Sequence, residues 1–200
     1  SSAASDVYKR QIIFGTVASN LPRKGLPYLA QAIKTVSEKL EDAKFYILTT
    51  PQGKAHFIGL DNVFVSTRFG SLPRGEVLSL IGSFDYYICS SLAEGFGLPV
   101  LEAQAYGIPV IYPDYDPLNE ITHPTANFPI KIIGEEYQSQ NQGILFLIRD
   151  YNPADMADQI EKAYEIYTCK PEEYQKLSQQ VKEYATQFDI MKTYSKFVKE

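Results

Sequence analysis

The segment from residue 85 to residue 113 constrains the fold most, because a strand, a glycine-containing loop, a helix and another strand follow one another within it. Residues 85–89 are mostly aromatic and β-branched, which favours a strand. Gly95 and Gly97 then permit a sharp turn and let a ligand approach the main chain. A helix follows until Gly107 ends it, and the next apolar run predicts a second strand. The segment therefore predicts two parallel strands joined by a helix.

Apolar runs alternate with helical patterns along the rest of the chain as well. The expected strands are 11–17, 45–48, 62–66, 85–89, 108–112, 130–133 and 143–148, and the expected helices are 27–40, 72–81, 99–106, 153–167, 171–188 and 190–198. This alternation predicts the α/β class, with a doubly wound parallel sheet that carries helices on both faces in the Rossmann-like manner. The polar residues 1–10 are expected to be a disordered tail or an expression remnant outside one domain of residues 11–200.

The amino-acid composition limits the kinds of partner that the protein could bind and the cell compartment in which we expect it. The net charge of -5 argues against broad nucleic-acid binding. Cys89 and Cys169 are the two cysteines, so no disulfide framework is implied and the reducing cytoplasm is the simpler expectation. No apolar run approaches the roughly 20 residues that span a bilayer. We therefore expect a cytoplasmic protein without a transmembrane segment.

The topology predicts where a ligand binds. If the strand order is 3-2-1-4-5, the first and fourth strands flank the point at which the order reverses, and ligands bind beyond their carboxyl ends. The loop after the first strand carries Arg23 and Lys24, and the loop after the fourth carries Glu94 and the two glycines that follow it. We therefore expect these two loops to meet, although they lie far apart in the sequence.

The residues of the second loop favour a phosphate site beside a hydroxyl site. The first amides of the helix after Gly97 have no partner within the helix and lie at the positive end of its dipole, where phosphate binds. We place Glu94 in the loop and Glu102 in the first helical turn, where both carboxylates can accept hydrogen bonds from sugar or ribose hydroxyls. The alternative is ordinary fold chemistry: glycines in a turn, an acidic residue that complements the dipole, and solvated charges at Arg23 and Lys24.

Residues 94–103 (Glu-Gly-Phe-Gly-Leu-Pro-Val-Leu-Glu-Ala), continuing through 107–111, closely resemble the paired-glutamate motif of retaining GT-B glycosyltransferases. The resemblance extends over residues 12–198 as the C-terminal, donor-binding half of that fold. It implies a hexosyltransferase that moves a sugar from a UDP-, GDP- or ADP-sugar to an acceptor with retention of configuration. It implies no metal ion and no other cofactor.

The resemblance also implies a role for each site residue. Lys24 would neutralise the donor diphosphate, Glu94 would contact the hexose hydroxyls, and Glu102 would hold the ribose hydroxyls. Lys24 and Glu94 are therefore the candidate catalytic residues. The family usually carries an arginine five residues before the lysine, where this chain has Ser19, and Arg23 is the candidate substitute. The remaining donor contacts would come from the loop and helix start at Gly95, Phe96, Gly97 and Leu98.

A GT-B enzyme has two such domains, and the acceptor-binding N-terminal half is not within these 200 residues. We therefore predict a transferase domain that is inactive alone, needs an acceptor-binding domain as partner, and can lie at a membrane surface through that other half. The helix at 190–198 is expected to cross back to it. Two alternatives remain open: a module that binds a nucleotide sugar without transferring it, and a doubly wound scaffold that binds none.

Asp114 and Asp116 offer one competing site. The sequence Asp114-Tyr115-Asp116 resembles the acidic pair with which the other major glycosyltransferase fold holds a metal ion, and carboxylates do bind magnesium or manganese. Pro113 and Pro117 flank the three residues and instead favour a turn. Because the paired-glutamate loop already accounts for a donor site, we expect no metal here.

Overall fold

Six parallel strands form the central sheet in the order β3-β2-β1-β4-β5-β6. The computed structural model describes residues 11–140, 143–189, 191 and 195. The prediction for residues 1–10, and that for the helix at 190–198 except positions 191 and 195, lie outside these residues. The α/β class and the order of the first five strands are confirmed, and a sixth strand extends the sheet beside β5. The strands are β1 (Ile12–Val17), β2 (Ala43–Leu48), β3 (Val63–Ser66), β4 (Tyr86–Ile88), β5 (Val110–Pro113) and β6 (Phe128–Ile130).

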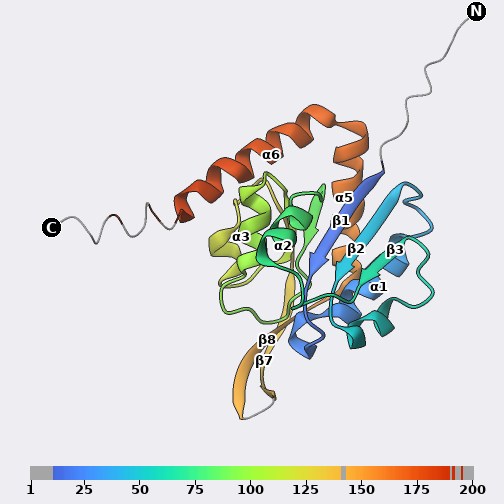
Figure 1. The fold of residues 1–200 in the computed structure, drawn as a ribbon, viewed down its shortest axis with the longest axis vertical. Coiled ribbons are helices and arrows are strands. Elements are labelled where there is room, and N and C mark those ends of the chain that lie inside the picture. The colour runs from blue at the N-terminus through green and yellow to red at the C-terminus, as the bar shows by residue number, and fades with distance from the viewer. Residues whose placement is uncertain (1–10, 141–142, 190, 192–194, 196–200) are drawn as a thin grey trace, which may run out of the picture.

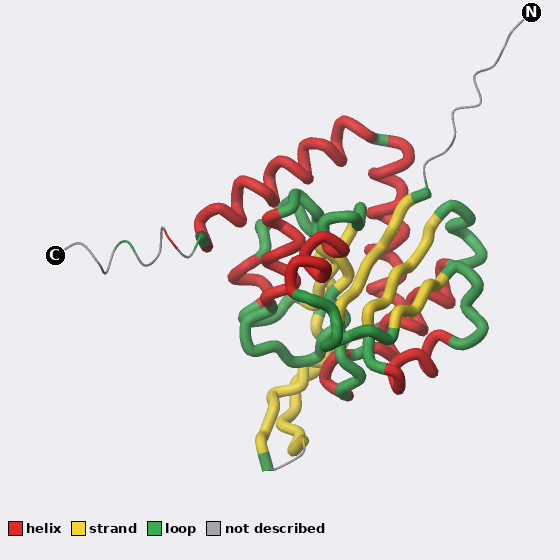
Figure 2. The backbone as a smooth tube through the Cα atoms, viewed as in Figure 1, coloured by secondary structure: helices red, strands yellow, loops and turns green. Residues whose placement is uncertain are grey.

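Helices cover both faces of the sheet (Figure 1). One face packs on α1 (Leu26–Val36) and α5 (Pro153–Cys169), and the other on α2 (Arg74–Ile81), α3 (Leu98–Ala105) and α4 (Leu118–Ile121). The long helix α6 (Pro171–Ala185) runs along α3 and α5 (Figure 2). Short 3-10 turns complete the fold as η1 (Pro22–Lys24), η2 (Pro51–Phe57) and η3 (Thr186–Phe188).

The alternation of side chains along the strands divides the core into two layers. Tyr86 and Phe14 stack with ring centroids 5.4 Å apart on the face that α1 and α5 cover. Tyr87 and Cys89 belong to the cluster on the opposite face, beside α3. Successive residues of β4 therefore serve opposite cores, as a strand buried on both sides requires.

The predicted strands at 130–133 and 143–148 are confirmed as strands, but most of their residues lie outside the parallel sheet. Only β6 joins the sheet, while β7 (Ile132–Gln140) and β8 (Ile144–Tyr151) pair with each other as an antiparallel hairpin. This hairpin projects beyond the carboxyl end of the sheet (Figure 1). The side chains of Ile144 and Leu145 are 54% and 63% exposed, so this apolar run does not form a buried strand.

Helices α1 and α6 end earlier than the sequence predicts. Helix α1 ends at Val36 instead of residue 40, and α6 ends at Ala185 before the 3-10 turn η3.

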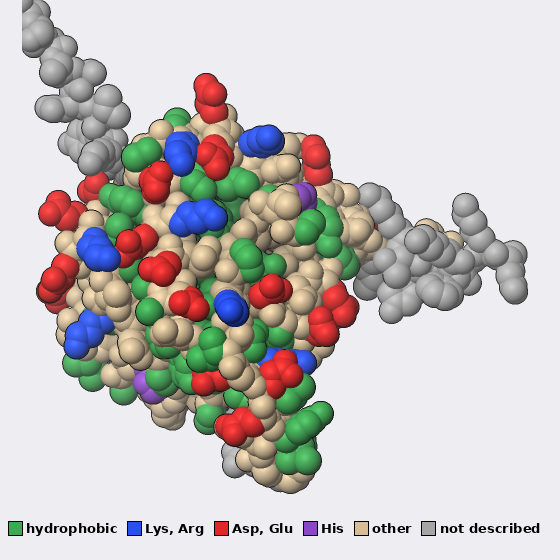
Figure 3. Space-filling view, turned by 180° about the vertical axis from the view of Figure 1, so that it is seen from behind, with side chains coloured by type: hydrophobic (Ala, Val, Ile, Leu, Met, Phe, Trp, Pro, Cys, Tyr) green, Lys and Arg blue, Asp and Glu red, His purple; other side chains and the backbone are tan. Residues whose placement is uncertain are grey.

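On the face shown in Figure 3, Lys and Arg side chains lie among Asp and Glu side chains and form no single basic surface. Within the described residues, no helix combines the length and the apolar character that a membrane span requires.

Candidate functional site

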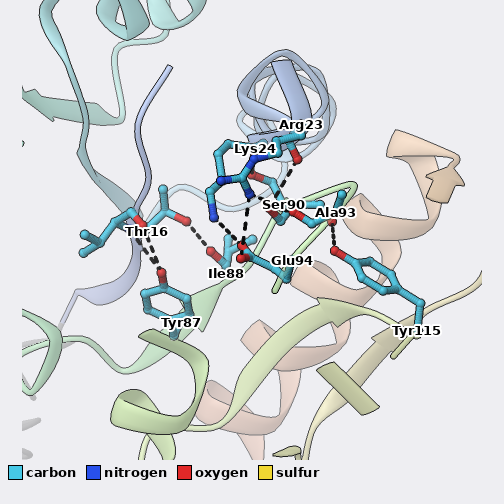
Figure 4. Close-up of polar contacts among 11 residues, drawn as sticks. Thr16, Arg23, Lys24, Tyr87, Ile88, Ser90, Ala93, Glu94 and Tyr115 are labelled. Carbon is cyan, nitrogen blue, oxygen red and sulfur yellow. Dashed lines mark hydrogen bonds and ion pairs between the residues drawn. The ribbon is translucent and has the colours of Figure 1, made fainter. Parts of the chain in front are cut away.

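The two predicted loops meet at the carboxyl ends of β1 and β4. Nζ of Lys24 in η1 lies 2.5 Å from Oε1 of Glu94, in the loop after β4. Nη1 of Arg23 donates to the Ala93 carbonyl at 2.9 Å and lies 4.0 Å from Oε2 of Glu94. Figure 4 shows both cationic side chains reaching toward the Glu94 carboxylate. The switch point of the sheet thus brings together residues about seventy positions apart, as its topology predicts.

The backbone of η1 is fixed against the end of β4. Gly25 follows η1 with φ of 62°, and a Cβ there would lie 2.0 Å from the Ser90 carbonyl oxygen, so only glycine fits. The Ser90 hydroxyl donates to the Lys24 carbonyl at 2.7 Å, and the Leu92 amide donates to the Arg23 carbonyl at 2.7 Å. The main chain that carries Lys24 is therefore held from both sides.

The loop that leads to Glu94 is held just as firmly. Each of the four carbonyls of residues 90–93 accepts a hydrogen bond from another part of the chain. The donors are the Tyr151 hydroxyl to Ser90 (2.8 Å), the Tyr115 hydroxyl to Ser91 (2.9 Å), the Arg149 amide to Leu92 (2.8 Å) and the Arg23 guanidinium to Ala93 (2.9 Å). The backbone position of Glu94 is consequently set by β8, by the segment after β5 and by η1.

The N-terminus of α3 has no side-chain cap. Gly97 precedes the helix with φ of 87°, and no side chain caps that end with a hydrogen bond. A Cβ on Gly97 would lie 2.7 Å from Cδ2 of Leu118, whereas a Cβ on Gly95 would have no neighbour within 4 Å. Phe96 and Leu98 expose 45% and 57% of their surface beside it. The backbone amides at this helix end therefore have no side-chain cap, and the space next to Gly95 is open.

Side chains of β1, β4 and α3 enclose a hollow below the ion pair of Lys24 and Glu94. The hollow is lined by Thr16, Val17, Ala18, Lys24, Tyr87, Ile88, Cys89, Ser90, Ser91, Glu94, Gly97, Pro99 and Val100. Burial raises the pKa of the Cys89 thiol to about 12. Burial also raises the pKa of Tyr87 well above its usual value, and the charges of Glu94 and Glu102 add to this effect. Both groups stay neutral, so the charge in the hollow comes from Lys24 and Glu94.

Glu102 does not lie where the sequence places it. It begins the second turn of α3, whose first turn contains no acidic residue, and it does not line the hollow around Lys24. Its carboxylate instead pairs with Arg74, the first residue of α2, with Nη1 and Oε2 3.1 Å apart and Nη2 in contact with Oε1. Sequence reasoning missed this partner. The one available signal was a basic residue directly after Pro73 at a helix start.

The acidic pair beside Tyr115 does not gather into a metal site. Asp114 and Asp116 are exposed, and Tyr115 between them is buried with its hydroxyl bonded to the Ser91 carbonyl. Within the residues that the structure describes, no group of three or more His, Cys, Asp or Glu side chains is placed to hold a metal ion. The role of Tyr115 is therefore to hold the loop before Glu94.

The fold and the meeting loops define an α/β domain of the Rossmann-like class, whose ligands bind at this end of the sheet. The family of group 1 glycosyl transferases matches residues 1–188, and the chain belongs to this family. A curated relative, Uncharacterized glycosyltransferase 335 of Sulfolobus islandicus rod-shaped virus 1, is 31% identical over 196 residues, covering 96% of this chain and 57% of the relative. The chain thus spans little more than half the length of that relative.

Solved structures of GT-B glycosyltransferases share the fold. A TarM variant from S. aureus, solved with UDP, fondaparinux and alpha-GlcNAc-glycerol, is 18% identical with a TM-score of 0.67, covering 94% of this chain and 34% of TarM. The C-terminal domain of a group 1 family glycosyl transferase (LpcC) from Francisella tularensis is 19% identical with a TM-score of 0.63. That match covers 90% of this chain and 87% of the LpcC domain.

Proposed function

We propose that this chain is the donor-binding half of a retaining glycosyltransferase that uses a nucleoside diphosphate sugar. The observation that carries the proposal is the Lys24–Glu94 ion pair beside the uncapped N-terminus of α3. The match to the isolated C-terminal domain of LpcC supports the assignment to one half of an enzyme. The UDP in the TarM complex supports a nucleoside diphosphate as the ligand class. Retention is carried over from the resemblance of residues 94–103 to the paired-glutamate motif.

In this mechanism the leaving group is a nucleoside diphosphate, so its growing negative charge has to be stabilised. The Lys24 ammonium group and the amides at Gly97 and Leu98 supply that stabilisation without a metal ion. Arg23 places a second cation beside Glu94. This position supports Arg23 as the substitute for the arginine that the family usually carries where this chain has Ser19.

Glu94 has a complementary task. When a donor phosphate binds the Lys24 ammonium group, the Glu94 carboxylate loses its 2.5 Å hydrogen bond to Lys24. The carboxylate can then accept hydrogen bonds from the hexose hydroxyls. Glu102 accepts from the ribose hydroxyls one helical turn further along α3. Because Cys89 and Cys169 are both free thiols, we place the protein in the reducing cytoplasm, where nucleotide sugars are available.

Calorimetry with UDP, GDP, ADP and their sugars tests this function on the chain itself. We expect one of these ligands to bind, and Lys24→Ala and Glu102→Ala each to weaken binding by tenfold or more, since a hydrogen bond to a charged group contributes about 1.5–3 kcal/mol. Lys39→Ala is the matched control, because Lys39 pairs with Glu161 at 2.6 Å elsewhere on the surface. Unchanged affinity in both site variants would remove the assignment of the site.

A module that binds a nucleotide sugar without transferring it is the second candidate, because the Lys24–Glu94 pair and the uncapped start of α3 support ligand binding and do not by themselves require transfer. Both candidates predict the same affinities for the isolated chain. They differ in sugar transfer once an acceptor-binding half is supplied.

A further inference from the structure

Arg74 and Glu102 form a two-pronged ion pair between α2 and α3. Nη1 of Arg74 lies 3.1 Å from Oε2 of Glu102, and Nη2 contacts Oε1. The planar guanidinium group therefore holds both oxygens of the carboxylate at once, which fixes the plane of the carboxylate as well as its position.

The stability of α2 does not account for this arginine. Arg74 is the first residue of the helix, at the positive end of the helix dipole, where a cation is unfavourable. Glu76 in the same turn is the residue that complements the dipole. The Arg74 side chain is 60% exposed, and an ion pair with so exposed a partner contributes little to folding. What the pair does achieve is the orientation of Glu102, whose side chain is only 14% exposed.

The held carboxylate keeps room for two more donors. A carboxylate has about four lone-pair positions, and the two N–H groups of Arg74 occupy two of them. The other two suit a pair of neighbouring hydroxyl groups, such as the 2′ and 3′ hydroxyls of ribose. Glu102 lies four residues after Leu98, the first residue of α3, and the start of this helix lines the hollow together with Lys24 and Glu94. The carboxylate is therefore about 6 Å along the helix axis from that end, within the span of one nucleoside diphosphate.

We propose that Arg74 is a positioning residue that holds the Glu102 carboxylate toward the ribose diol and so sets a preference for ribonucleotides over deoxyribonucleotides. This inference rests on the proposed function, in which Glu102 accepts hydrogen bonds from the ribose. Arg74 acts through Glu102 and touches neither the diphosphate nor the sugar. This proposal narrows the ligand class to nucleoside diphosphates whose ribose has free 2′ and 3′ hydroxyl groups.

The test compares ribose with deoxyribose. The first step identifies which of UDP, GDP and ADP the unaltered chain binds most tightly. The affinity for this diphosphate is then compared with the affinities for its 2′-deoxy form and for inorganic pyrophosphate. The unaltered chain should prefer the ribose form about tenfold or more, since one hydrogen bond to a charged group is lost in the deoxy form. Glu102→Gln, Arg74→Ala and Arg74→Lys should each lower this preference, with pyrophosphate affinity unchanged. Lys39→Ala, equally exposed at 60%, should leave the preference intact.

The outcomes separate this inference from the proposed function. If Glu102→Gln lowers the preference and Arg74→Ala does not, Arg74 has no positioning role while the site assignment stands. Full preference in Arg74→Lys, which keeps the charge without the two-pronged geometry, would also overturn the inference. Tighter ribonucleotide binding by Arg74→Ala would mean that Arg74 competes with the ribose for Glu102. If the unaltered chain binds the ribose form and the 2′-deoxy form of the diphosphate with equal affinity, the proposed role of Glu102 itself is refuted.

Discussion

Lys24 and Glu94 neutralise each other in the free protein, so a ligand at the proposed site would have to separate the two charges. Their side chains are only 19% and 12% exposed, and their charged atoms lie 2.5 Å apart. A phosphate group competes with Glu94 for the ammonium group, and sugar hydroxyls offer the released carboxylate new donors. In the proposed site, a nucleoside diphosphate alone would leave Glu94 with Arg23, 4.0 Å away, as its remaining charged partner, whereas a nucleoside diphosphate sugar would add hydroxyl donors.

Removing the Glu94 charge should therefore change the two kinds of ligand in opposite ways. We expect Glu94→Gln to bind a nucleoside diphosphate about threefold to tenfold more tightly, because a competing and repelling charge a few ångströms away is gone. The same variant should lose the added affinity that the hexose confers. Calorimetry with each diphosphate and its sugar measures both effects, with Glu161→Gln as a control at the surface pair with Lys39. Weaker binding of the bare diphosphate would contradict this account.

The residues of the site differ in how far the sequence reveals them. The meeting of Lys24 with Glu94 could be predicted because local apolar patterns indicate the alternating strands and helices, and the doubly wound fold that they favour has a strand order with a switch point. Arg74 was missed because its contact with Glu102 joins two helices across 28 positions and depends on how α2 packs beside α3. The first-turn placement of Glu102 was wrong because α3 begins at Leu98 and its first four residues lie before Glu102.

At the level of elements, the start of α3 depends on Gly97. We expect Gly97→Ala to lower the free energy of unfolding by about 1–3 kcal/mol, because a side chain at φ of 87° is strained and its Cβ would meet Leu118 at 2.7 Å. Gly95→Ala is the matched control, with no neighbour within 4 Å of the added Cβ. Chemical denaturation of both variants measures the difference. Equal losses would show that the turn does not require glycine at position 97.

The β7–β8 hairpin shows where element prediction from sequence ends. Its second strand contains the run Ile144 to Ile148, whose letters resemble those of a buried parallel strand. Periodicity cannot separate the two cases, because a short apolar run is compatible with either. The distinction lies in packing: Ile148 is buried at the base of the hairpin, while Ile144 is 54% exposed nearer its tip.

For the whole molecule, the proposed reaction needs a second domain. The chain spans 57% of its curated relative and matches a C-terminal domain of another group 1 enzyme. We expect the chain to bind its nucleotide sugar alone but to transfer no sugar until an acceptor-binding half is added, because the resemblance to GT-B enzymes implies that the acceptor binds on that other half. A radiolabelled transfer assay with and without that half checks this expectation. Transfer by the isolated chain at the rate of the two-domain protein would disprove it.

The four tethered carbonyls of residues 90–93 have a kinetic consequence. Since β8, η1 and the segment after β5 each anchor that stretch of main chain, we expect residues 90–93 to keep their place when a donor binds. Admitting a donor at the proposed site then depends on new torsion angles in the Lys24 and Glu94 side chains, and such rotations are faster than collective domain motions, which take microseconds to milliseconds. Capture of the nucleotide should accordingly run at the pace of diffusional encounter, with no slow unimolecular phase ahead of it.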